Sequence, residues 1–235
     1  MSAPPAGRNE PAPSVPSLPG DSPLAALPPH RLPIFPLSGV VLLPRTRLPL
    51  HIFEPRYVAM TRDAIAGLPY IGMVQPIPAA AGDKPPVFGI GCAGRIVEKR
   101  EVGEGRLLIA LAGVCRFQIV AELDAATPYR VVDASYAAFT ADLGDEDAAD
   151  IDLADLLRTV KNFLRRREFK GDLATISRSP AAELINWLAM VLPLSPSEKQ
   201  ALLQAAGLGQ RALLLNRLLQ LAALESPSGA TGAIH

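Results

Sequence analysis

The chain of 235 residues is long enough for one large domain or two small ones, and its 49% hydrophobic content can supply a buried core. The 23 basic and 23 acidic residues balance, which argues against a general binder of polyanions. Two cysteines and three histidines do not supply the four closely spaced nitrogen or sulfur ligands of a structural zinc site, so we expect no metal.

Both ends of the chain differ in composition from its middle. Residues 1–29 are rich in proline, alanine, serine and glycine, which predicts a disordered, solvated tail, with a proline-rich ligand for a partner as the alternative. Residues 226–235 form a second, polar tail. No apolar run is long enough for a membrane helix, and the N-terminus lacks the pattern of a signal peptide. The expected location is therefore the cytoplasm, without membrane contact.

Residues 32–65 consist of short apolar segments separated by prolines, followed by a helical pattern. Because proline removes a hydrogen-bond donor from a sheet, these segments belong at strand starts, edges or bulges. Pro55 suits the first turn of a helix, and Gly67 is placed to end it. This stretch therefore predicts a strand, a loop, a second strand and a helix.

The next part of the chain predicts further strands. Residues 87–102 and 106–121 are apolar runs joined by Gly103, Glu104 and Gly105, which is the pattern of a hairpin. Apolar side chains occupy alternate positions of the second run and extend to both faces in its middle, which favours a closed or coiled sheet. With short strands at 70–75 and 129–136, residues 30–137 predict a small, mostly antiparallel β-barrel with one helix packed against it.

Residues 138–225 predict a helical bundle. A helix with acidic residues at its start and basic residues at its end is followed by one that runs from Ser179-Pro180 to about Leu192. A third begins at Ser195, where Ser-Pro-Ser-Glu forms a capping box, and a fourth covers about 208–224. The fold class is thus α+β, a barrel followed by a bundle.

Several short motifs suggest catalysis or nucleotide binding, but each has a simpler interpretation. Residues 89–94 match the GxGxxG pattern, yet a strand and a hairpin follow it where a dinucleotide site needs a helix, so tight packing or strand bending is favoured. Ser195 and Lys199 are four residues apart, but capping explains the serine, and we expect the lysine on an exposed turn. Cys115 and His51 are the only conceivable thiol–imidazole pair, and nothing in the sequence brings them together.

Several segments resemble the N-terminal, substrate-binding domain of Lon protease. They include LPIFPLSGVVLLP, LPLHIFEPRYVAM, VFGIGCAGRIVEKREVGEGRLLIALAGVCRFQI and LPLSPSEKQALLQAAGLGQRALLLNRLLQL, and the resemblance covers about residues 31–225. It implies a PUA-like barrel followed by a helical bundle, with roles in substrate recognition and oligomerisation. The chain looks like a stand-alone form without the ATPase and Ser-Lys protease domains. No catalytic residue and no cofactor carry over, and Leu43-Pro44-Arg45 departs from the Phe-Pro-Gly usual in the family.

These observations favour a non-catalytic polypeptide-binding module, in protein quality control, with polypeptide segments or a protein partner as ligand and with self-association left open. Its predicted contact patch is an apolar loop beside two arginines, namely Val41, Leu42, Leu43, Arg45 and Arg47.

Two alternatives remain open. The first is an RNA-associated module with a stripe formed by Arg95, Arg100, Arg106 and Arg116, against which the neutral charge and 5% aromatic content count, so we expect no nucleic acid. The second is an ATP-independent hydrolase.

Overall fold

The computed structural model describes residues 27–78, 84–103, 105–144, 148, 150–166 and 179–224. The predicted N-terminal tail lies outside these residues except for positions 27–29, and the predicted C-terminal tail lies outside them entirely. The hairpin residue Glu104 is also outside them, as are several charged residues predicted to flank the first helix of the bundle.

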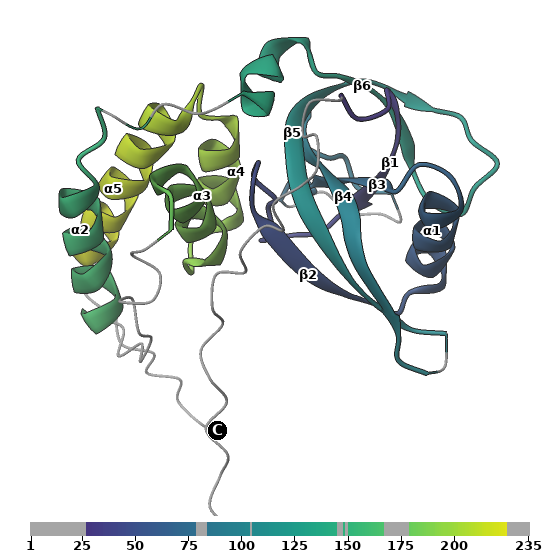
Figure 1. The fold of residues 1–235 in the computed structure, drawn as a ribbon, viewed down its shortest axis with the longest axis horizontal. Coiled ribbons are helices and arrows are strands. Elements are labelled where there is room, and N and C mark those ends of the chain that lie inside the picture. The colour runs from purple at the N-terminus through teal and green to yellow at the C-terminus, as the bar shows by residue number, and fades with distance from the viewer. Residues whose placement is uncertain are drawn as a thin grey trace, which may run out of the picture.

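Six strands form a nearly closed sheet in which β5 meets three neighbours (Figure 1). The order is β2-β5-β4-β3-β1-β6, and β6 pairs again with the far end of β5, which closes a ring of five strands. All pairings are antiparallel except that of β1 with β3. The mostly antiparallel barrel predicted from the sequence is confirmed, with strands β1 Arg31–Pro36, β2 Arg47–Ile52, β3 Tyr70–Val74, β4 Ile90–Glu101, β5 Leu107–Leu123 and β6 Val131–Ser135.

Strand β5 is long enough to serve two parts of the barrel. Its first residues pair with β2, from Leu107 opposite Ile52 to Ala112 opposite Arg47. Its last residues, from Gln118 to Leu123, pair with β6. The turn before β5 is the predicted hairpin, in which Gly103 and Gly105 have φ of +84° and +72°, values that glycine adopts without steric cost.

One helix, α1 (Pro55–Ala66), packs against the barrel on the side opposite the other helices (Figure 1). Pro55 occupies its first turn, as predicted, and Gly67 is its C-cap. Its buried face includes Tyr57, Met60 and Ala64, which belong to the same apolar cluster as the barrel residues Ile71 and Ile109.

The remaining helices follow the barrel in the chain and gather at one side of it (Figure 1). The predicted capping box is present at α4, where the Ser195 Oγ accepts from the Glu198 amide and the Glu198 carboxylate accepts from the Ser195 amide. The helices are η1 Ala137–Leu143, a 3₁₀ helix, and α2 Leu153–Arg166, α3 Ala181–Val191, α4 Pro196–Gln204 and α5 Leu208–Leu224.

Barrel and helices share one hydrophobic core and a set of buried polar contacts. The same apolar cluster contains Leu42 and Leu111 from the barrel and Leu188 from α3. At its edge, the side-chain amide of Gln75 donates to Gln200 Oε1 at 3.1 Å, and Gln200 Nε2 donates to the carbonyl of Ile90 at 3.0 Å. Because buried polar groups must be paired to be tolerated, these bonds fix how α4 lies on the sheet.

The largest buried side chain of the barrel is a charged one, Arg116 on β5. Its guanidinium forms an ion pair with Asp142 of η1 at 2.7 Å, and the two side chains are only 2% and 1% exposed. The same guanidinium donates to the carbonyls of Leu203 and Ala205, at the end of α4. One side chain of the sheet is therefore bonded to both η1 and α4.

Candidate functional site

The predicted contact patch is wrong for its three apolar residues, because they are part of the core. Val41, Leu42 and Leu43 are 2%, 0% and 0% exposed. Their loop lies flat on the sheet, where the burial of apolar side chains is more favourable in free energy than their exposure to water would be. They cannot contact a partner in this structure.

Two glycines of the sheet explain why the loop can lie so close. A Cβ atom added to Gly113 would fall 2.8 Å from the carbonyl carbon of Leu43 and closer still to its oxygen. A Cβ atom on Gly94 would fall 2.6 Å from the Leu42 side chain. Both positions lack a side chain where the loop passes. The sheet is also irregular between Ala93 and Gly94, which confirms the packing and bending interpretation of this glycine-rich segment.

The two arginines of the predicted patch are half-buried and engaged within the chain. Arg45 has φ of +62°, the left-handed conformation, at the position where the resembled family has glycine. Its side chain donates to the carbonyl of Gly144. Arg47 forms an ion pair with Glu98 at 2.8 Å, in which the arginine is 13% and the glutamate 66% exposed.

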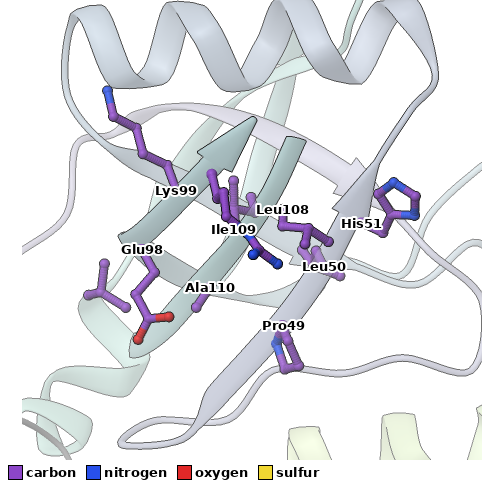
Figure 2. A pocket seen from close by; sticks show the side chains of 10 residues that line it. Pro49, Leu50, His51, Glu98, Lys99, Leu108, Ile109 and Ala110 are labelled. Carbon is purple, nitrogen blue, oxygen red and sulfur yellow. The ribbon is translucent and has the colours of Figure 1, made fainter. Parts of the chain in front are cut away.

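A different surface has the shape expected for a ligand. A groove of about 830 Å³ lies on the outer face of β2, β5 and β4 (Figure 2). The strand register places its side chains in two rows across the three strands. One row contains Pro49, Ala110 and Glu98, and the other contains His51, Leu108 and Arg100.

The groove combines an apolar floor with polar edges. Leu108 and Ala110 come from the central strand β5, while His51, on the edge strand, and Glu98 are exposed around them (Figure 2). Arg100, which also lines the groove, is exposed. Beyond His51, the Phe53 ring is 62% exposed at a centroid distance of 5.8 Å from the imidazole. The sequence reasoning missed this surface because only the register of three strands brings these residues together.

Strand β2 leaves one edge without a strand partner among the described residues. The carbonyl of Thr46 accepts a hydrogen bond from the Gly113 amide of β5. The backbone N–H and C=O groups of every second residue after Thr46 therefore also point toward β5. Pro49, three positions on, therefore faces the open edge, where its missing N–H costs the existing sheet nothing. The prediction that the prolines of this region belong at strand edges holds for β2.

The predicted arginine stripe is not a continuous surface. Arg116 is buried in its ion pair with Asp142, Arg95 and Arg106 are half-buried, and Arg100 is exposed. A buried cation that is already paired cannot reach a phosphate backbone, so the arrangement proposed for RNA binding is wrong at Arg116.

The serine and lysine of the suggested dyad have other partners. Ser195 serves the capping box. Lys199 is half-buried, not exposed as predicted, and its Nζ donates to the carbonyls of Gly39 and Met190 at 3.0 and 2.8 Å. Burial lowers the Lys199 pKa, but both carbonyls are hydrogen-bond acceptors that hold the ammonium form in place.

The thiol and imidazole of the second suggested pair do not meet. His51 is exposed opposite Leu108, whereas Cys115 lies seven residues further along β5, a distance of about 23 Å in an extended strand. The Cys115 thiol is buried against the carbonyl of Phe139 at 3.2 Å, and burial raises its pKa to about 12. A thiol in this environment is protonated and a poor nucleophile.

Among the described residues, no group of three or more His, Cys, Asp or Glu side chains is arranged to hold a metal ion. Within the same residues, no helix has both the length and the apolar character needed to cross a membrane.

The fold and the groove define a class of protein: an α+β barrel with a packed helical bundle and an open surface groove. The family model described as the ATP-dependent protease La (LON) substrate-binding domain matches residues 31–220, and the chain belongs to this family. The resemblance noted in the sequence is thereby confirmed.

Curated relatives are longer proteins. Lon protease 2 of Myxococcus xanthus is 28% identical over 195 residues, a match that covers 81% of this chain and 24% of that protein. The Lon protease of Flavobacterium johnsoniae is 30% identical over 194 residues, covering 79% of this chain and 23% of that protein. The chain thus spans about a quarter of the length of these relatives.

Solved structures of similar domains share the fold. A Lon N-terminal domain protein from Xanthomonas campestris has a TM-score of 0.55 and 24% identity, covering 81% of this chain and 97% of that one. The N-terminal domain of the Mycobacterium avium complex Lon protease has a TM-score of 0.56 and 17% identity, covering 83% and 98%.

Proposed function

We propose that the chain is a non-catalytic module that binds polypeptide segments in the groove on β2, β5 and β4, and that it serves protein quality control in the cytoplasm. The observation that carries the proposal is an open, apolar-floored groove on a member of a substrate-binding family. Its partner is an extended segment of an unfolded or partly folded protein.

The shape of the groove supports an extended ligand. It is open to the surface and is lined by three neighbouring strands, so an extended segment lying parallel to them would place alternate side chains over the floor at a spacing of about 7 Å. Glu98 and Arg100 are two residues apart on β4 and match this spacing. An apolar residue of the ligand would cover Leu108 and Ala110, and an acidic neighbour would lie near Arg100.

The edge of β2 supplies a second means of holding such a segment. Main-chain groups on an unpaired edge can add a strand, which gives affinity without requiring a particular sequence. Pro49 removes one donor from this edge and so weakens sheet extension by other chains. A module that must accept many segments, but not aggregate, fits this combination.

A substitution in the floor of the groove tests the proposal. Leu108→Asp places a charge where the ligand's apolar side chain would lie, and loss of that burial should weaken binding about tenfold to a hundredfold. Fluorescence anisotropy with labelled casein, an unfolded polypeptide, measures the affinity. Val120→Asp is the matched control, because Val120 is 63% exposed on the same strand and outside the groove.

Two results would contradict the proposal, provided that circular dichroism and urea unfolding show both variants to be folded. One is the absence of casein binding by the unmodified chain. The other is equal affinity of the Leu108→Asp and Val120→Asp variants.

A further inference from the structure

A second, more enclosed cavity of about 280 Å³ lies away from the groove. It is bounded by the first turn of α1, the end of β1, the segments that flank the β3–β4 connection and the residues that lead into β6. Four prolines form much of its wall, and the chemically active side chains around it are Arg56, Tyr57, Lys84, Tyr129 and Arg130.

Tyr57 is the feature that points to a ligand. The side chain is only 6% exposed, and its ring packs on Phe35 with centroids 4.2 Å apart, which fixes its orientation. Tyr57 lines the cavity, and its hydroxyl is not one of the side-chain atoms that are buried without a partner among the described residues, so the cavity gives access to it. Burial raises the Tyr57 pKa, so the group is available as a donor at neutral pH.

Three of the side chains that line the cavity are cationic, and two of these are paired with carboxylates that lie outside the lining. Arg130 is paired with Glu122 at 2.6 Å and donates to the Pro85 carbonyl at 2.8 Å, and Arg56 is paired with Glu54 at 2.9 Å. Lys84 has no ion pair with a described residue and is exposed at the cavity.

No acidic side chain lines the cavity among the described residues. The nearby Asp63 carboxylate accepts from the Tyr129 hydroxyl at 2.7 Å and lies outside the lining. The cationic lining therefore favours an anionic ligand, and the three carboxylates just outside it, Glu54, Asp63 and Glu122, disfavour one with a double charge, such as phosphate.

We propose that this cavity binds the terminal carboxylate of a polypeptide that ends in an apolar residue. The Tyr57 hydroxyl and the Lys84 ammonium donate to the carboxylate, and the proline walls contact the last side chain. Capture of a C-terminal carboxylate is an established mode of peptide recognition. This inference rests on the proposed function in one respect: it takes the natural ligand to be a polypeptide.

The test compares a labelled peptide ending in leucine as the free acid with the same peptide as its C-terminal amide. We expect the acid to bind about tenfold more tightly, as one charge-assisted hydrogen bond would produce. Tyr57→Phe, which removes only the hydroxyl, should reduce the affinity for the acid about threefold to tenfold and leave the amide unchanged. Lys84→Gln should act in the same direction.

A cavity-sized probe separates this proposal from the groove. N-acetyl-leucine, titrated into the isotope-labelled protein, should shift the NMR resonances of Tyr57 and Arg130, whereas N-acetyl-leucinamide should not. If these shifts occur but casein does not bind, the proposed function fails and the carboxylate site stands. If Leu108→Asp weakens the binding of the acid and amide peptides by the same factor, so that the ratio of their affinities is unchanged, both the proposed function and the carboxylate site stand.

Three outcomes would overturn the carboxylate site. The first is equal binding of the acid and amide probes. The second is unchanged binding of the acid by the Tyr57→Phe variant. The third is displacement of N-acetyl-leucine by inorganic phosphate at concentrations where acetate has no effect, which would identify a phosphate site.

Discussion

The close approach of the loop at residues 40–44 to the sheet makes Gly113→Ala a sharp test of the structure. The added Cβ would lie 2.8 Å from the Leu43 carbonyl carbon and nearer to its oxygen, and both are backbone atoms. A backbone obstacle cannot rotate away as a flexible side chain can, so the loop must retreat by about 1 Å from a core in which Leu42 is fully buried.

The expected cost is about 3 kcal/mol of unfolding free energy, the upper end of the range for overpacking a well-packed core. For a chain of this size, that loss should lower the melting temperature by roughly 6–12 °C. Urea unfolding followed by circular dichroism measures the free energy directly, and a thermal scan checks the shift.

Gly89→Ala is the matched control for this prediction. A Cβ atom at Gly89 meets no atom within 4 Å, and its φ is not in the left-handed region. It should therefore be neutral or stabilise the protein by less than about 1 kcal/mol. If Gly113→Ala and Gly89→Ala have the same stability within about 0.5 kcal/mol, the loop does not lie on the sheet as described.

Two further predictions concern buried ionisable groups. Arg116→Met should lower the unfolding free energy by about 3–5 kcal/mol, because it leaves the Asp142 carboxylate buried without its partner. Adding Asp142→Leu should recover part of this loss, as measured by urea unfolding. If the effects of the two substitutions are strictly additive in the double variant, the buried pair is contradicted. The pKa of the Cys115 thiol is raised to about 12 in the folded chain, against about 8.5 in the unfolded chain. The stability that the protonated thiol contributes is therefore complete below pH 8.5 and is lost as the pH rises toward 12. Between pH 9 and 11, the stability of the unmodified chain should fall more steeply than that of Cys115→Ala, by about 1.4 kcal/mol per pH unit, and parallel pH profiles would show that this thiol is not protected.

Local patterns in the sequence predicted most of the fold. Proline at the start of α1, glycines in the β4–β5 turn and the Ser195 capping box each involve residues within a few positions of one another, so their geometry follows from the chain alone. The barrel followed from alternating apolar positions on β5, together with the family resemblance.

The candidate site could not be predicted in the same way, because it depends on contacts between distant segments. An apolar loop has the same sequence pattern whether it is exposed or buried. Here the loop is buried because Gly94 and Gly113 have no side chains to keep it away from the sheet. The signal in the sequence is Gly113, a residue without a side chain within the apolar row of β5. The groove and the cavity need the register of several strands, which residue spacing does not specify.

Arg116 was also misinterpreted, and for a physical reason. A cation in a long strand is usually solvated, but this one stands between Cys115 and Phe117, both fully buried, in the apolar middle of β5. A charge in such surroundings requires a partner from elsewhere in the chain. Its partner, Asp142, belongs to the acidic segment that the sequence pattern predicts as the start of a helix.

The partners of Arg116 also limit how the chain can be divided. A fragment that ended at residue 137 would keep this guanidinium in the barrel wall but lose both the carboxylate that neutralises it and the α4 carbonyls that complete its hydrogen bonds. The barrel is therefore not a portable unit that can be moved to another protein by itself. For engineering, a transferable piece that retains the groove has to include the helices through α5, because Leu215 and Leu219 of α5 are fully buried in the core shared with the barrel.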